Sequence, residues 1–416
     1  MGRFFSDTVE IALRNIYYQM WTGQGQQAFQ SLEHASEAGD GDASCLLARC
    51  YCGSQYVWRG HHFPENDRMA SQLLHRSVEQ GSAIGVMTAL RSGELSPALQ
   101  NKMSFGSLQE AFDLVLDMAR AGEPFCQYII GNAYFWWDFL RIQKKSRQDF
   151  SSQDAFQSYL RENISKCEEW FWKSFRNGMY LSGINLNYYY QNGNENLILP
   201  HPEKAADLNR IGAEYGYPNY QSDYGAELWT AERYDESFRW LKEAAGHGEV
   251  EACFYLGMAY EYGHGVEANA AKAAECYTIG LDSKGYQIGC SNRLGALYFL
   301  GSGVPQDYAK AFQLLRWAYD RVPTNNWGAY YLGACYAYGY GTQQDYTLAR
   351  KFLEMVNWNS RDAFYLLGYL YARGLGGPED IPKGVEYLQK AGDHADARKE
   401  LKNYKKTFFG GKWVRR

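Results

Sequence analysis

The sequence predicts an all-α protein built as an array of about ten helix pairs. Three observations lead to this prediction: the length of 416 residues, a motif that recurs every 35–38 residues, and apolar residues spaced four apart within the motif. A single core rarely grows past about 250–300 residues, so a chain of this length forms either several domains or an elongated array. The regular motif favours the array.

The motif is clearest in residues 251–393, where it occurs four times. Each copy contains Leu-Gly-x2-Tyr, and a Gly-x-Gly segment begins three residues after the tyrosine. The glycine that follows the leucine advances by 38, 38 and 35 residues from copy to copy. These glycines are Gly257, Gly295, Gly333 and Gly368.

Each fixed position has a physical reason to occur in a helical hairpin. Ala, Leu and Tyr at i, i+4 and i+8 lie on one face of a first helix, termed helix A. The glycine after the leucine is expected to let a neighbouring helix approach closely. The Gly-x-Gly segment is expected to end helix A, because residues beyond a helix C-terminus often need a positive φ. A second helix, helix B, then follows a short loop in which Asp307 and Asp345 are predicted N-caps.

Residues 1–250 are predicted to carry degenerate copies of the same repeat. Glycines at the expected ends of helix B recur there at intervals of 32–56 residues, and the longest interval holds an insertion near residues 141–161. Insertions in repeat arrays often lie on the binding face. We favour the simpler interpretation that helices A and B are lengthened here and that the flanking aromatic triplets, Phe135–Trp137 and Trp170–Trp172, pack within their own pair.

The charge of the chain is low but uneven. The net charge is −5, which provides no strong field to attract nucleic acid or an anionic membrane. Residues 398–416 nevertheless carry eight basic residues and one acidic residue. We expect residues 394–416 to form a C-terminal capping helix and a basic tail, and we expect no nucleic-acid or membrane partner.

The cysteines and the hydropathy pattern point to a reducing compartment. Nine cysteines, an odd number at irregular spacing, form neither a disulfide framework nor a zinc pattern. No segment supplies about 18 uncharged apolar residues, and the N-terminus lacks the apolar centre of a signal peptide. The expected location is cytoplasmic.

The motif resembles the Sel1-like repeat, a relative of the tetratricopeptide repeat with a longer connection that contains Gly-x-Gly. The resemblance is close over residues 251–393 and holds in outline over residues 1–250. It implies a right-handed α/α superhelical solenoid whose concave face is built mostly by helix A and which serves as a scaffold or adaptor for a partner protein. A second function that it implies is a cytoplasmic immunity protein that neutralises a toxin by occlusion. Secreted members have a regular cysteine pair in each repeat, which this sequence lacks.

Helix A positions beside the packing stripe are the candidates for partner binding. Counted from the leucine of Leu-Gly, these positions are −5, −2, +2 and +5, and they are rich in the aromatic residues that anchor protein interfaces. The alternative is that these aromatic side chains are buried between helices. The predicted partner-binding residues are Phe254, Met258, Trp327, Tyr330, Tyr365 and Tyr369.

Signals for catalysis are weak. The sequence contains no G-x-S-x-G, no H-E-x-x-H and no phosphate-binding loop. His61 and His62 with Asp67 have no evident third ligand for a metal, and Cys50 or Cys126 has no adjacent base. We therefore expect no catalytic residues, no metal and no cofactor. A hydrolase with its site in the groove is the alternative of another class.

Overall fold

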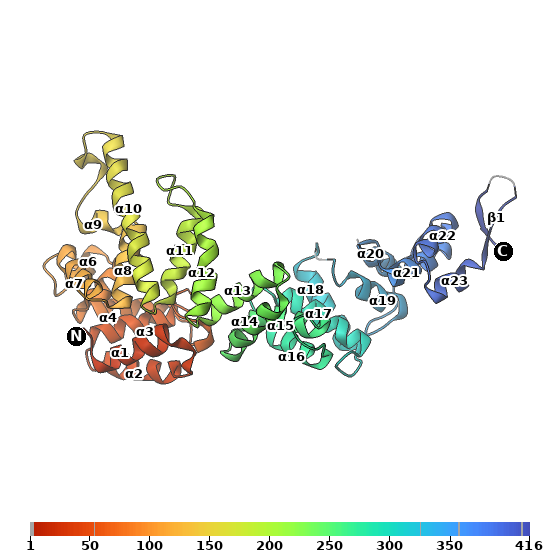
Figure 1. The fold of residues 1–416 in the computed structure, drawn as a ribbon, viewed down its shortest axis with the longest axis horizontal. Coiled ribbons are helices and arrows are strands. Elements are labelled where there is room, and N and C mark those ends of the chain that lie inside the picture. The colour runs from red at the N-terminus through yellow and green to blue at the C-terminus, as the bar shows by residue number, and fades with distance from the viewer. Residues whose placement is uncertain (1–3, 54, 325, 357, 409–410) are drawn as a thin grey trace. The chain divides into compact units, whose positions relative to one another are not determined.

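The computed structural model describes residues 4–416 apart from residues 54, 325, 357, 409 and 410. The described residues form 23 α-helices and two three-residue strands (Figure 1). The chain divides into two compact units, Met1–Tyr224 and Gly225–Arg416, here called unit 1 and unit 2. The all-α array of helix pairs is confirmed.

Unit 2 repeats one hairpin four times, and in each hairpin helix A packs against its own helix B. Asp307 and Asp345 cap their B helices as predicted, because their carboxylates accept hydrogen bonds from backbone N–H groups of the first turn. Helix α14 (Tyr234–Gly246) precedes these pairs, and α13 (Pro218–Thr230) contains the boundary between the units. The A helices are α15 (Ala252–Tyr262), α17 (Gln287–Leu300), α19 (Ala329–Tyr338) and α21 (Arg361–Ala372), and the B helices are α16 (Ala270–Gly280), α18 (Tyr308–Arg321), α20 (Tyr346–Glu354) and α22 (Ile381–Lys390).

The Gly-x-Gly segments end the A helices in the predicted way. All eight glycines of the four Gly-x-Gly segments have φ between 66° and 74°, the left-handed region that other residues adopt at a cost. The second glycine of each segment has an additional role. A Cβ atom on Gly265, Gly303, Gly341 or Gly376 would lie under 3.0 Å from backbone atoms at the start of the preceding helix B. These glycines therefore also set the contact between consecutive repeats.

The glycine after the leucine brings helix A close to helix B, also as predicted. A Cβ atom on Gly295 would lie 2.8 Å from Cγ of Leu315, and one on Gly333 would lie 2.6 Å from Cγ of Leu353. Any larger residue would force the two helices apart, because protein interiors are close-packed.

Unit 1 is built around one large apolar core. After the first repeat, its A helices, each the first helix of a packed pair, are α3 (Gly41–Tyr51), α5 (Ala83–Ser92), α8 (Pro124–Phe135) and α11 (Tyr180–Asn192). The first repeat departs from regular geometry, because α1 (Asp7–Leu13) continues as a π-helical segment, Arg14–Tyr18. The other helices are α2 (Gly25–Glu37), α4 (Asp67–Glu79), α6 (Pro97–Gln100), α7 (Leu108–Arg120), α9 (Asp138–Ile142), α10 (Gln153–Arg176) and α12 (Pro202–Glu214).

Residues 141–161 comprise the end of α9, a 3-10 turn at Arg147–Asp149 and the beginning of α10. Helix α10 has 24 residues and is the helix B of its pair. Phe135 and Phe171, one from each flanking aromatic triplet, are buried and pack with their ring centroids 6.2 Å apart. The triplets thus contact each other within one helix pair.

The C-terminal residues form a short helix and a β-hairpin, and the sequence analysis expects the helix but not the hairpin. Helix α23 (Ala395–Leu401) is followed by the antiparallel strands β1 (Tyr404–Lys406) and β2 (Trp413–Arg415). Tyr404 is 3% exposed, lies in the core of the last repeat, and donates a hydrogen bond to Glu400. This anchor ties the basic segment to the end of unit 2.

The two glycines of one Gly-x-Gly segment should respond differently to substitution. Gly339→Ala should cost about 1–2 kcal/mol, because φ is positive but a Cβ would meet nothing closer than 3.6 Å. Gly341→Ala should cost about 3 kcal/mol or more, because the Cβ would also overlap the backbone of Tyr308. Urea unfolding followed by circular dichroism measures both losses. Equal losses would contradict the role of the second glycine in the contact between repeats.

Candidate partner-binding surface

The structure separates the predicted site residues into exposed and buried groups. Phe254 and Tyr365, at the −2 position of their A helices, are partly exposed. At +2, Met258 is 7% exposed and packs in the core near Tyr277 and Leu294, so it contributes no surface. Only Tyr369 is partly exposed among the +2 residues of unit 2.

We use the name A-helix surface for nine partly or fully exposed residues of unit 2 that lie on the A helices or just before one. Five of its members were predicted from the sequence, and the structure adds four more. The surface consists of Phe254, Tyr262, Arg293, Trp327, Tyr330, Tyr331, Tyr338, Tyr365 and Tyr369.

Arg293 is the centre of the N-terminal part of this surface. Its guanidinium lies 4.9 Å from the ring centroid of Trp327, 5.3 Å from that of Tyr262 and 5.8 Å from that of Phe254. Cations are attracted to the faces of aromatic rings. Residues from three consecutive repeats are therefore joined by one side chain.

An ion pair holds Arg293 in this position. Its Nη1 atom lies 3.0 Å from Oε2 of Glu261, and the two side chains are only 12% and 22% exposed. The same nitrogen donates to the Tyr262 hydroxyl at 2.7 Å. Glu261 also accepts a hydrogen bond from Tyr277 on helix B. These contacts hold the Arg293 guanidinium in one position.

Tyrosines continue the surface toward the C-terminus. The ring of Tyr331 lies 6.3 Å from that of Trp327 and 5.0 Å from that of Tyr330, measured between centroids. Burial raises the pKa of Tyr330, and the carboxylate of Asp362 on the next helix A raises it further. Burial and the neighbouring Tyr365 raise the pKa of Tyr338 to about 12. These hydroxyl groups therefore stay protonated at neutral pH and remain hydrogen-bond donors.

The last A helix ends the surface with a second set of supported rings. Tyr365 stacks on His394 with centroids 4.5 Å apart and an interplanar angle of 15°. Tyr369 lies under the guanidinium of Arg373 at 4.4 Å, and Arg373 is held by Glu400 through hydrogen bonds of 3.1 Å. The two tyrosines are thus oriented by side chains that follow them in the chain.

Arg293 is one of the four surface residues that the sequence analysis missed. It occupies the position directly before Leu-Gly, outside the four positions chosen as candidates. The signal that marks it is a charged residue one place from the packing stripe of an otherwise uncharged helix. Its partners could not be deduced, because they lie in the preceding and following repeats.

The residues considered for metal binding or catalysis do not converge. His61 is 5% exposed and its Nε2 lies 2.9 Å from the carbonyl oxygen of Ile16, whereas His62 is exposed. Burial raises the pKa of Cys50 and of Cys126, which leaves both thiols protonated and unreactive. Among the residues that the structure describes, no three His, Cys, Asp or Glu side chains are placed to hold a metal ion.

In the described part of the chain, no helix combines the length and the apolar character that crossing a bilayer requires.

Comparison with known proteins identifies the repeat. The Sel1 repeat family matches residues 250–282, 290–321, 328–355 and 362–396, which coincide with the four helix pairs of unit 2. These four pairs are Sel1 repeats. The resemblance inferred from the Leu-Gly and Gly-x-Gly motifs is confirmed, and Sel1 repeats generally mediate protein–protein interactions.

Two solved structures with Sel1-like repeats are similar to the chain. One is c5321, described as a protective antigen of uropathogenic Escherichia coli with an SLR fold; it is 20% identical, the match covers 95% of this chain and 86% of that one, and the TM-score is 0.46. The other is a Sel1 repeat protein from Oxalobacter formigenes, 23% identical over 53% of this chain and 86% of that one, with a TM-score of 0.38.

Removing Arg293 should destabilise unit 2, because Glu261 would be left partly buried without its cation. We expect Arg293→Ala to lower the free energy of unfolding by about 1–3 kcal/mol. Arg361→Ala is the matched control, because its ion pair with Asp393 is exposed on both sides, and it should cost less than about 1 kcal/mol. Chemical unfolding measures both.

A double variant tests the reason for the loss. If the unpaired carboxylate is the cause, Glu261→Gln in the Arg293→Ala background should recover part of the stability. If the losses in unfolding free energy of Arg293→Ala and Glu261→Gln simply add in the double variant, the proposed network is contradicted.

Proposed function

We propose that the chain is a non-catalytic scaffold that binds a partner protein through the A-helix surface of its Sel1 repeats. The observation that carries the proposal is the shared register of partly exposed aromatic side chains on three of the four A helices. Phe254, Tyr330 and Tyr365 occupy the same −2 position in three repeats, and Trp327 and Tyr369 lie beside them.

The composition of the surface supports binding to protein. Tryptophan, tyrosine and arginine dominate the energetic centres of protein interfaces, because they combine large apolar area with hydrogen-bonding groups. The A-helix surface contains these types almost exclusively. A partner that presents apolar side chains together with hydrogen-bond acceptors for the tyrosine hydroxyls would complement it.

The rigidity of the surface also supports this function. Phe254 stacks on Tyr286 with centroids 5.0 Å apart and planes inclined by 5°, and Tyr365 is stacked on His394. Arg293 is fixed by Glu261 and Tyr262. Side chains already held in one conformation lose little entropy on binding, so a larger part of the contact energy appears as affinity.

The cysteines support action in the cytoplasm. All nine are free thiols, and eight of them are buried. Free thiols persist in reducing compartments, whereas extracellular proteins tend to form disulfides.

The proposal is tested by identifying a partner and then weakening its binding. Tagged wild-type protein, Tyr330→Ala and Tyr365→Ala are used for affinity purification with quantitative mass spectrometry. The Kd for the partner retained by the wild type is then measured. Each substitution should cost at least about 2 kcal/mol, or roughly 30-fold in Kd, while the melting temperature changes little.

Trp317→Ala is the matched control. Trp317 is a partly exposed aromatic residue on helix B (α18), where it stacks with Arg321 at 3.8 Å. Its removal should leave the affinity for the partner unchanged. Folded Tyr330 and Tyr365 variants with wild-type affinity, or an equal loss in Trp317→Ala, would contradict the A-helix surface as the binding face.

A further inference from the structure

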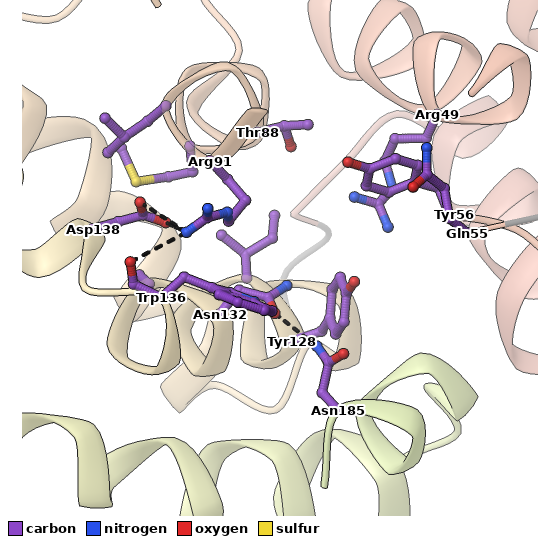
Figure 2. A pocket seen from close by; sticks show the side chains of 14 residues that line it. Arg49, Gln55, Tyr56, Thr88, Arg91, Tyr128, Asn132, Trp136, Asp138 and Asn185 are labelled. Carbon is purple, nitrogen blue, oxygen red and sulfur yellow. Dashed lines mark hydrogen bonds and ion pairs between the residues drawn. The ribbon is translucent and has the colours of Figure 1, made fainter. Parts of the chain in front are cut away.

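A cavity of about 230 Å³ lies among the A helices of unit 1. Residues from α3, α5, α8 and α11 and from the loop after α3 line it. Figure 2 shows Arg49 with Gln55 and Tyr56 on one side, and Arg91 with Asp138 and Trp136 on the other. Asn132, Tyr128 and Asn185 lie between these two groups in the same view.

Arg49 is buried without an anion. It is 4% exposed, and its Nη2 atom has no hydrogen-bond partner. Its Nε atom donates to the hydroxyl of Tyr17 at 3.1 Å. Among the described residues, no carboxylate forms an ion pair with Arg49. Arginine is almost never fully buried unless it is paired, because removing its charge from water is costly.

The surroundings stabilise the cation of Arg49 without neutralising it. Four ring centroids lie 4.9–5.8 Å from the guanidinium carbon, those of Tyr17, Tyr56, Phe125 and Tyr128. Burial raises the pKa of the Tyr17 hydroxyl, and it raises the pKa of the Cys45 thiol to about 11. Both neighbours are therefore uncharged at neutral pH, and one positive charge at the cavity remains unmatched.

The second arginine of the cavity is already paired. Arg91 donates to both carboxylate oxygens of Asp138, at 3.2 and 3.3 Å, and its guanidinium lies 5.1 Å from the ring centroid of Trp136. The amide of Asn185 donates to that of Asn132 at 2.7 Å. The remaining wall consists of Thr88 and the apolar residues Met87, Leu90, Ile129 and Ala133.

We propose that this cavity binds a small organic carboxylate, which pairs with the guanidinium of Arg49. A guanidinium and a carboxylate match in geometry and pair through two parallel hydrogen bonds. A single unmatched cation suits the single charge of a carboxylate, whereas a phosphate carries up to two charges. The apolar wall and Trp136 suit a carbon skeleton, and the amides of Asn132 and Asn185 suit a polar substituent. The volume lies below the roughly 300–1,000 Å³ of drug-sized sites, so the ligand is small.

The register of the repeat supports a built site. In unit 2 the leucine of Leu-Gly lies eight residues after Gly248, and the same count from Gly39, Gly81 and Gly122 reaches Leu47, Ala89 and Ile130. The residues two places after these three positions are Arg49, Arg91 and Asn132, all of which line the cavity. Three cavity residues therefore come from one register position, +2, on three successive A helices of unit 1. It stands independently of the proposed function, because it depends on other residues in another unit.

Calorimetric titration of the full chain tests the site. The probes are benzoate, N-acetylglycine and trialanine with a free carboxylate, and the controls are trialanine amide and inorganic phosphate. We expect at least one of the two small carboxylates to bind and both controls to fail. The proposal would be overturned if only phosphate bound or if no carboxylate bound. It would also be overturned if only trialanine bound, because the site would then recognise a peptide C-terminus.

Two variants assign the binding to the cavity. Arg49→Met should weaken the bound carboxylate at least tenfold and leave the melting temperature of the free protein unchanged or higher, because it removes an unpaired buried charge. Arg120→Met, at an exposed arginine of α7, is the matched control and should bind as the wild type does. Unchanged affinity in Arg49→Met would overturn the proposal.

If Arg49→Met does not fold, Asn185→Leu provides the test. Asn185 is only partly buried and lies on another helix, α11, so its replacement leaves Arg49 in place while it removes an amide and fills space. It should also weaken binding at least tenfold. Wild-type affinity in this variant would place the ligand elsewhere and overturn the assignment.

Discussion

The architecture of unit 2 depends on close backbone contacts that only glycine permits. The second glycine of each Gly-x-Gly segment lies against the start of the preceding helix B, and the glycine after each leucine lies against the side chains of its own helix B. The residue between the two glycines adds to this contact. Tyr340 stacks on Tyr308 of the preceding helix B with centroids 4.1 Å apart and an angle of 8°, and His264 stacks in the same way on Tyr234.

This constraint determines which side chains can act together. Because consecutive repeats meet at one fixed distance, side chains of neighbouring A helices come within reach of one another. Phe254, Trp327 and Arg293 come from three repeats and form one cluster. In unit 1 the +2 position of three successive A helices places Arg49, Arg91 and Asn132 around a cavity. One scaffold thus presents an aromatic surface in unit 2 and a polar, cationic cavity in unit 1, and the chemistry of each is set by the residues at a few positions.

The fold was predictable from the sequence because its determinants are local. Glycines with positive φ, aspartate N-caps such as Asp307 and apolar residues four apart each report the geometry of a few neighbouring residues. The site was predictable only in part. The aromatic −2 residues such as Phe254 are partly exposed, but the +2 residue Met258 packs in the core near Tyr277 of helix B and Leu294 of the next helix A. The roles of Arg293 and Arg49 depend on which side chains other repeats place beside them, and no local pattern contains that information.

We propose that the A helices of the Sel1 repeats form the binding face and that the B helices support it. This is tested by hydrogen–deuterium exchange of the full chain, with and without its purified protein partner. The partner should slow exchange in peptides from α15, α17, α19 and α21, with little change in α16, α18, α20 and α22. Protection confined to the B helices would contradict it.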